Sequence, residues 1–472
     1  MVGPDYHRPA VASSAGYLDG DKPGALAGDA QRFSNTVDVP AHWWTEFGSP
    51  QIDRLVQQAL ERNPDLASAR AALRAARSTL TAQRGTLFPQ VDLGASASRQ
   101  RNSVTLASPL NSNAEDYTLY TGQLNIAYTP DVFGGIRRQI ETVAAQAENQ
   151  KFAVEAAYLT LTSNVVVAAI QVASLQAQIQ ANEAIVKADQ DALDALNLQK
   201  RLGEASGADV VAQEATVAQA KAALPPLLKQ LGQQQHLLAQ LTGTTPSEFA
   251  KVSIDLDAIR LPRELPLTLP AKLVEQRPDI RAAEANVHAA SAQVGVAIAN
   301  RLPNISLSGA LGGTSTDIGT LLSNGNVLWA VTGGVTQPLF DAGTLREKQH
   351  ASEAQLDQAK EQYRSTVLSA FQNVADALLA LGQDSDALIA ATNSQEAALK
   401  SLNIARMKVQ QGEGNIAALL LAQQAYQQAR SATVQAQAAR YSDTAGLFQA
   451  LGGGWWRRED ADLAAVHTAA SD

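Results

Sequence analysis

Two long stretches of the chain carry apolar residues at intervals of four and three positions. The first shows this spacing through residues 154–179, and the spacing is typical of coiled coils. Residues 136–202 contain neither proline nor glycine, so we predict a single helix on the order of 100 Å long, at about 1.5 Å per residue. A glycine-containing break at residues 203–207 is followed by a second helix. Pro225 and Pro226 are expected to bend or open this second helix.

The second half of the chain repeats this arrangement. Residues 344–411 contain no proline, and apolar residues recur in the same steps between Val367 and Leu402. A turn at residues 412–414 and a return helix over residues 415–451 complete a second antiparallel hairpin. The apolar spacing alone also fits an ordinary coiled coil buried in a bundle, so the hairpins by themselves do not establish a function.

Four further segments alternate between apolar and small polar residues with the period of a β-strand. Each is about 10–12 residues long, the length that crosses a lipid bilayer at a tilt. Tyr120, Tyr128 and Trp329 lie near strand ends, as an aromatic girdle at the membrane surface would. A four-stranded sheet packed on a helix fits the same pattern. Four strands cannot close a barrel, whose minimum is about eight, so the membrane interpretation requires several chains to contribute strands.

The two halves also share one order of helix, strand and helix. Asn63-Pro64-Asp65-Leu66 and Arg277-Pro278-Asp279-Ile280 open the two short helical stretches, and Pro89 and Pro303 close them. The two openings are 214 residues apart, and so are the two closing prolines. A fixed offset over a whole unit indicates two internal repeats. Proline suits the first helical turn and the aspartate faces the positive helix end, so we interpret these motifs as structural and not catalytic.

Composition excludes several classes of function. The 472 residues include no cysteine, two methionines and six histidines, so we expect no disulfide, metal site or other cofactor. The net charge of −9 argues against a nucleic-acid partner. We found no apolar run of the roughly 20 residues that a membrane-spanning helix needs. The sequence also contains no phosphate-binding loop and no nucleophile elbow, so we do not expect an enzyme.

These features together resemble the outer-membrane efflux channel family, the TolC-like and OprM-like channels. The resemblance is closer to its lipoprotein branch, which serves tripartite efflux pumps of the RND type. The motifs that carry it cover nearly the whole chain, and their order and spacing are more specific than any one of them. They are Val2-Gly3-Pro4-Asp5-Tyr6, Trp43-Trp44-Thr45-Glu46-Phe47-Gly48, Asn63-Pro64-Asp65-Leu66, Asp131-Val132-Phe133-Gly134-Gly135, Leu224-Pro225-Pro226-Leu227, Leu241-Thr242-Gly243, Arg277-Pro278-Asp279-Ile280-Arg281, Gln337-Pro338-Leu339-Phe340-Asp341 and Leu451-Gly452-Gly453-Gly454-Trp455.

The resemblance implies a helix-rich fold with membrane strands, assembled as a homotrimer. Four strands from each chain would close one twelve-stranded barrel in the outer membrane of a Gram-negative bacterium. The helices would form a twelve-helix periplasmic α-barrel continuous with it. The implied function is that of a passive exit duct for drugs or other small toxic compounds. The implied partners are a periplasmic adaptor, an inner-membrane RND-type transporter and outer-membrane lipid.

The resemblance also implies a division of the chain into parts. Residues 1–62 would be an N-terminal segment in an equatorial belt, and residues 243–276 a linker in the same belt. Residues 63–89 and 277–302 would be equivalent shorter helices of the α-barrel. Residues 90–130 and 303–338 would supply two strands each, residues 134–242 and 342–451 the long hairpins, and residues 452–472 a C-terminal tail.

Family resemblance places the functional residues at the ends of the hairpins. The small residues of the two turns are predicted to dock the adaptor, and they are Gly203, Glu204, Ala205, Ser206, Gly207, Gly412, Glu413 and Gly414. Gly203 and Gly412 are equally compatible with plain helix C-caps. The predicted gate residues are Asp209, Leu419, Leu420, Leu421 and Gln423. Three copies of Asp209 would form a carboxylate ring that attracts cations, whereas Leu421 stands where the family often has an acid.

The lipoprotein branch carries a lipidated cysteine just before its Val-Gly-Pro-Asp-Tyr motif, where this chain has Met1. We nevertheless expect the native chain to be acylated. Two alternatives remain open. A type I secretion channel for proteins belongs to the same family, although the start of the chain and the Leu-Pro-Pro-Leu motif favour small-molecule efflux. A soluble periplasmic adaptor also has helical hairpins, but it would contain one hairpin and a lipoyl-like β domain.

Overall fold

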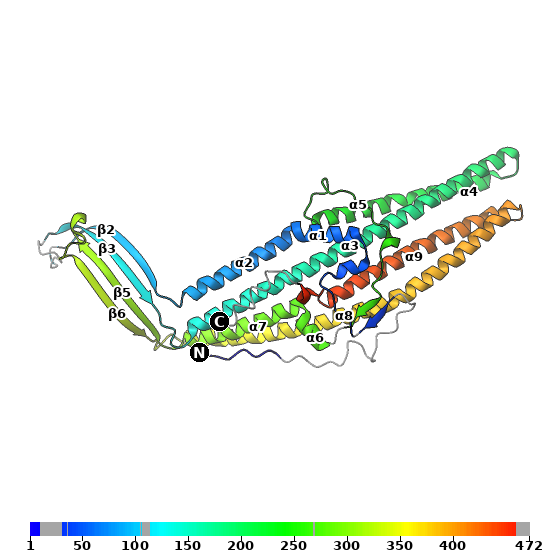
Figure 1. Cartoon of the computed structure of the whole chain (residues 1–472). Helices are drawn as coiled ribbons and strands as arrows, with labels where there is room; N and C mark the ends of the chain where they lie inside the picture. Colours follow the sequence, from blue (N-terminus) through cyan, green and yellow to red (C-terminus); the bar gives the residue numbers. More distant parts are fainter. Residues whose placement is uncertain (10–30, 35, 104, 106–113, 268–269, 459–472) are drawn as a thin grey trace. The chain divides into compact units, whose positions relative to one another are not determined.

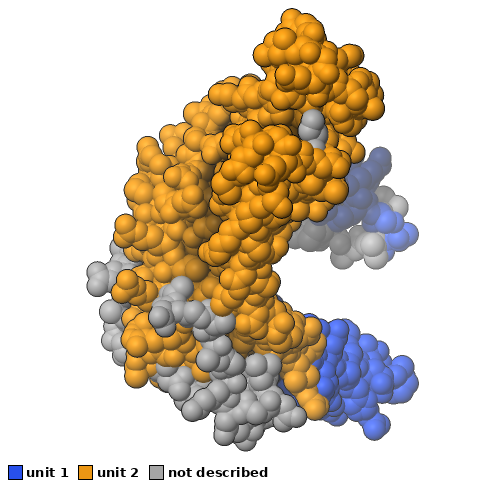
Figure 2. Space-filling view, turned by 90° about the vertical axis from the view of Figure 1, so that its right-hand side faces the viewer, with its two compact units in different colours: residues 1–10, 72–151, 282–363 blue, residues 11–71, 152–281, 364–472 orange. Residues whose placement is uncertain are grey.

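The computed structural model of the chain describes residues 1–9, 31–34, 36–103, 105, 114–267 and 270–458. The chain divides into two compact units (Figure 2). Unit 1 consists of residues 1–10, 72–151 and 282–363, and unit 2 consists of residues 11–71, 152–281 and 364–472. Four helices begin in one unit and end in the other.

Unit 1 contains one antiparallel sheet, formed by all four of the segments predicted to be strands. The strands lie in the order β2-β3-β5-β6 (Figure 1). Their bounds are Gln90–Arg101 for β2, Asp116–Tyr128 for β3, Asn304–Ser315 for β5 and Val327–Thr336 for β6. A short 3-10 helix, η3 (Ile318–Thr320), lies between β5 and β6. β2 and β6 form the two edges of this sheet.

The register of the sheet gathers its apolar residues on one face. Directly paired residues point to the same side of a sheet, and Leu93 pairs with Leu124, Leu124 with Leu311, and Leu311 with Trp329. The residues two positions away along each strand share that face. Its apolar and small members are Val91, Leu93, Ala95, Ala97, Tyr120, Gly122, Leu124, Ile126, Tyr128, Ile305, Leu307, Gly309, Leu311, Gly313, Val327, Trp329, Val331, Gly333 and Val335. At one end of the strands the same face carries Arg99, Arg101, Asp116, Thr118 and Ser315. The opposite face carries Ser, Thr, Asn, Gln, Gly and Ala at most positions.

Parts of four helices complete unit 1. These helices are α2 (Pro64–Gly85), α3 (Gly135–Leu202), α7 (Pro278–Ala299) and α8 (Thr344–Gln410). Within the described residues, α3 is the one helix with a window apolar enough to cross a membrane by length and composition. The sequence pattern did not lead us to expect this window. Because 61% of it is buried inside the chain, it has the character of a core helix.

The first nine residues run along the helices of unit 1. The backbone N–H of Val2 donates to the carbonyl of Phe133 at 3.2 Å. The buried side chain of Arg138 donates through Nε to the carbonyl of Val2 at 3.0 Å. The ring of Tyr6 stacks on His288 with ring centres 4.3 Å apart. These contacts fix the start of the chain beside the turn that leads from β3 into α3.

Unit 2 contains the two hairpin ends (Figure 1). The first hairpin pairs α3 with α4 (Gly207–Ala222) and α5 (Leu224–Leu241), and the second pairs α8 with α9 (Ile416–Ala450). The chain breaks between α4 and α5 because prolines at the second and third positions of α5 lack the N–H groups that would continue the helix. The smaller elements are β1 (Arg32–Ser34), η1 (Trp43–Phe47), α1 (Pro50–Arg62), η2 (Leu256–Ala258), β4 (Glu264–Pro266), α6 (Pro270–Gln276) and η4 (Trp455–Arg457).

Aromatic residues from both ends of the chain fill the core of unit 2. Trp43 and Phe47 are fully buried, and the ring of Trp43 stacks on Phe448 of α9 at 5.4 Å. The beginning of the predicted tail is held as well, because Arg458 forms an ion pair with Glu155 at 2.6 Å. These contacts attach the chain ends to the first third of α3 and to the end of α9.

The two repeated helix openings have the structural role that the sequence indicated. The side chain of Asn63 accepts a hydrogen bond from the backbone N–H of Leu66 at 3.0 Å, which caps α2. Arg277 donates to both carboxylate oxygens of Asp279, at 3.0 and 2.6 Å, and to the carbonyl of Ala450 at 2.9 Å. The second motif therefore ties the start of α7 to the end of α9.

Candidate functional site

The turn between α3 and α4 is built from two helix caps. Gly203 has φ of 82°, a left-handed conformation that glycine adopts without strain, and its N–H donates to the carbonyl of Lys200 at 3.1 Å. Ser206 caps α4, and its hydroxyl accepts from the backbone N–H of Asp209 at 3.2 Å. The carboxylate of Asp209 accepts from the hydroxyl of Ser206 at 2.7 Å and from its N–H at 3.2 Å. Asp209, a predicted gate residue, therefore also completes a capping box.

The turn between α8 and α9 follows the same plan. Gly412 has φ of 74°, and the N–H of Glu413 donates to the carbonyl of Lys408 at 2.9 Å. A side chain at Gly414 would come within 2.6 Å of the backbone nitrogen of Val409, so only glycine fits there. The side chain of Asn415 accepts from the N–H of Ala417 at 2.8 Å and starts α9. Both turns are thus closed by hydrogen bonds, and Glu204 and Glu413 are exposed at them.

The predicted gate residues of α9 do not share one face of the helix. Leu421 is 67% exposed, whereas Gln423 is 6% exposed, as expected for residues two positions apart on a helix. Leu419 and Leu420 are half-buried. Leu421 is therefore the one among these four whose side chain is open to solvent in a single chain, and Gln423 belongs to the packing between helices.

The three predicted girdle residues lie on the apolar face of the sheet but not in one row. Tyr128 is the last residue of β3, whereas Tyr120 and Trp329 lie inside their strands. Trp329 pairs with Leu311, and through it is in register with Leu124, midway between the two tyrosines. Trp329 is 75% exposed. The register thus confirms a common face and leaves the girdle a prediction.

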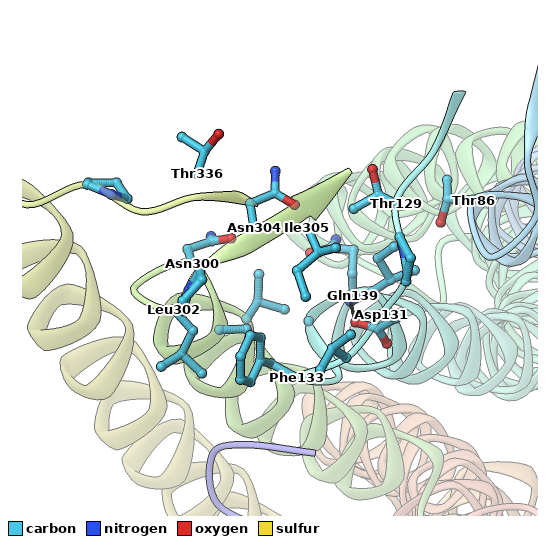
Figure 3. Close-up of a pocket in the computed structure, with 18 of the residues that line it drawn as sticks. Thr86, Thr129, Asp131, Phe133, Gln139, Asn300, Leu302, Asn304, Ile305 and Thr336 are labelled. Atoms are coloured by element: carbon cyan, nitrogen blue, oxygen red, sulfur yellow. Dashed lines mark hydrogen bonds between the residues drawn. The ribbon is translucent and has the colours of Figure 1, made fainter. Parts of the chain in front are cut away.

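A cavity of about 780 Å³ lies in unit 1 where the strands meet the helices (Figure 3). Its lining includes the turn from Pro130 to Phe133, the end of α7 and the start of β5. Asp131 accepts from the backbone N–H groups of Ile136 and Arg137, both at 2.9 Å. Burial opposes ionisation here, but these hydrogen bonds and the charge of Arg137 hold the pKa of Asp131 below its usual range. The motif that contains Asp131 therefore serves as the cap of α3.

Across the described ranges, no group of three or more His, Asp or Glu side chains is arranged to hold a metal ion. Ser206, predicted from the sequence only as a docking residue, is the cap of α4, and Asn415, which was not among the predicted site residues, is the cap of α9. A Ser or Asn followed by an acid or a helical run is the signal that identifies such caps.

Comparison with known proteins places these features in a family. The family model described as "Outer membrane efflux protein" matches residues 55–244 and 269–453. The toluene efflux pump outer membrane protein TtgF of Pseudomonas putida is 30% identical, over 96% of this chain and 93% of that protein. The solved structure of the outer-membrane channel OprN is similar with a TM-score of 0.86 and 29% identity, covering 96% of this chain and 99% of that one. The open-state outer membrane channel MtrE of Neisseria gonorrhoeae gives a TM-score of 0.83 with 27% identity, over 96% and 98% of the two chains.

Proposed function

This chain belongs to the outer membrane efflux protein family, and we propose that it is the outer-membrane exit duct of a tripartite efflux pump. It conducts drugs or other small toxic compounds passively from the periplasm to the exterior, and it opens and closes at the hairpin ends. The observation that carries this proposal is the sheet of unit 1, whose apolar residues share one face.

That face has the properties of a lipid-facing surface. Leu93 is 82% exposed and Val331 is 78% exposed, values that are costly for large apolar side chains in water. The strands contain 10 to 13 residues, and about 9–11 are needed to cross a bilayer. The small polar residues of the opposite face would line a water-filled exit.

The edges of the sheet support assembly into a closed ring. β2 and β6 are edge strands whose outer backbone groups have no partner strand among the described residues, and an open edge is not tolerated in lipid. Pairing β6 of one chain with β2 of the next closes the sheet. We propose a homotrimer with one twelve-stranded barrel and a twelve-helix α-barrel, in which each chain contributes two internal repeats.

The partners follow from the two closed turns. We propose that the residues around Gly203 and Gly412 dock a periplasmic adaptor, which joins the duct to an inner-membrane RND-type transporter. The absence of large side chains at both glycines would let the adaptor backbone approach closely. The gate is proposed to involve Asp209 of the first hairpin with Leu419, Leu420, Leu421 and Gln423 of the second. Residues 1–62 and 243–276 are proposed to form the belt.

The place of the N-terminus supports a lipid anchor. The backbone N–H of Val2 donates a hydrogen bond to the carbonyl of Phe133. Phe133 lies in the turn that follows strand β3. If the strands cross the membrane, this turn lies at the membrane surface, within reach of an acyl chain. We propose that the native protein is lipid-anchored here. Intact-mass analysis of protein from its native membrane should find a lipid adduct. An unmodified mass would contradict the proposed lipid anchor and would leave the proposed duct unaffected.

Reconstitution into planar lipid bilayers tests the main proposal. We expect discrete channel currents, and negative-stain electron microscopy of the detergent-extracted protein should show threefold particles. A protein that is released without detergent as a monomer and carries no current would contradict both the barrel and the duct. A threefold particle without current would keep the assembly and contradict the conducting function.

A further inference from the structure

The apolar stripe of α3 includes a buried aspartate, Asp189. The steps of four and three that run from Val154 to Ile179 continue through Asn182, Val186 and Asp189 to Leu193. Leu193 belongs to a buried apolar cluster between α3 and α4, and Asp189 is only 1% exposed. An aspartate is almost never this buried unless its charge is compensated.

Residues from three other helices surround this carboxylate. Gln427 of α9 donates to Asp189 Oδ2 at 3.5 Å, a long hydrogen bond. Gln213 of α4 donates to the carbonyl of Asp189 at 2.8 Å. Arg406 of α8 provides the nearby positive charge that favours ionisation. Asp189 is thus the point where α4 of the first hairpin and both helices of the second converge on α3.

The polar groups at this point are incompletely satisfied. Asp189 Oδ1 is buried without a hydrogen-bond partner, and the same holds for Oε1 of Gln213. Burial raises the pKa of Asp189, and the two glutamines and Arg406 offset this only in part. A buried charge with unmet hydrogen bonds weakens the contact that contains it.

We propose that Asp189 is a positioning residue for opening of the duct. Its buried, incompletely bonded carboxylate keeps the contact between the α3–α4 and α8–α9 hairpins weak enough for the hairpins to part. This inference rests on the proposed function, because hairpin separation opens a path only if the hairpin ends form the gate. The opposite role, a latch that holds the hairpins together, would require a well-bonded carboxylate.

The substitution Asp189→Asn keeps the shape of the side chain and removes its charge. The new amide can donate to the unmet oxygen of a neighbouring glutamine, so the hairpins should pack more tightly. We expect single-channel recordings in planar bilayers to show an open probability about fivefold lower than that of the unmodified protein. Asp189→Leu, which restores the apolar stripe, should act in the same direction. Asp191→Asn, at an exposed position of the same helix, should leave the open probability unchanged.

A distance measurement separates this inference from the proposed function. The chain has no cysteine, so spin labels can be attached at Glu204→Cys and Glu413→Cys, with labelled chains diluted in unlabelled ones. Asp189→Asn should narrow the distribution of distances between the two turns. Narrowing without any channel current in either protein would support the hairpin contact and contradict the duct. An unchanged distribution and open probability, or a higher open probability in Asp189→Asn, would overturn the inference.

Discussion

Asp384 of α8 and Asp443 of α9 form a carboxyl pair within unit 2. A proton on one of the two carboxyl groups relieves the repulsion between two negative charges. Burial, together with the hydrogen bond and the charge of Asp443, raises the pKa of Asp384 to about 7, while Arg440 opposes the shift. Because this pKa lies above its value of about 3.9 in an unfolded chain, the pair stabilises the fold when protonated. That contribution is lost as the pH rises through about 7.

The substitution Asp384→Asn should therefore flatten the pH dependence of stability. An amide can donate to Asp443 without losing a proton, so the unfolding free energy should change by about 1 kcal/mol less between pH 6 and pH 8, a figure reduced for solvent screening. Thermal unfolding in detergent across this range measures the effect. Asp386→Asn, at an exposed position of α8, is the matched control. If the unfolding free energy changes equally with pH in the unmodified protein and in both variants, the two carboxyl groups are not coupled.

Leu421 is the residue on which the gate prediction is most easily tested. Its side chain is 67% exposed, so Leu421→Ser should leave the folding of the chain intact. If three copies of Leu421 pack near the axis, the smaller and polar serine should raise conductance in planar bilayers. Leu368→Ser, an exposed position far from the hairpin end along α8, controls for the loss of a leucine. Equal conductance of the two variants would exclude Leu421 from the gate.

At the scale of elements, Asp209 in the turn between α3 and α4 has two roles that can be tested separately. It caps α4, and it is proposed to belong to a ring of carboxylates. Ser206→Ala and Asp209→Asn both weaken the capping box, and each should lower local stability by about 1 kcal/mol. Only Asp209→Asn removes a carboxylate. We expect reversal potentials in a salt gradient to show weaker cation preference for Asp209→Asn and an unchanged preference for Ser206→Ala. If both variants keep the original preference, Asp209 is a cap and not part of a selective ring.

The elements themselves were largely predictable from local pattern. Alternation predicted the four strands, and the four-three spacing predicted α3 and α8, because these signals depend on which face of an element is buried. The effect of Pro225 was also predictable, since proline removes a helix donor wherever it occurs. The four-three spacing places Asp189 on the buried face of α3, but its partners Gln213 and Gln427 could not be predicted, because they come from other helices. The common face of Tyr120 and Trp329 likewise required the register of β3, β5 and β6.

At the scale of the whole molecule, the apolar sheet face and the open edges of β2 and β6 lead to one expectation. A single chain leaves both features exposed. Contact of the apolar face with water is unfavourable, and the unpaired backbone groups of the edges would be unfavourable in lipid. The membrane and the neighbouring copies together remove both penalties. Assembly and insertion should therefore depend on each other, and a charge on the apolar face should impair both.

Val331 and Thr332 allow this dependence to be tested with adjacent residues. Val331 pairs with Gly309 on the apolar face and is 78% exposed, whereas Thr332 pairs with Ser308 on the opposite face. Near the bilayer midplane, a lysine on the lipid face of a barrel costs about 2–4 kcal/mol, and three copies multiply this penalty. Val331→Lys should therefore reduce the trimer recovered from outer membranes, measured by detergent extraction and sizing, while Thr332→Lys should assemble normally and alter only the conducted current. If the two variants assembled equally well, the apolar face would not be in contact with lipid. The apolar face would then have to be covered by protein. The main physical reason for a barrel closed by pairing β6 of one chain with β2 of the next would be lost.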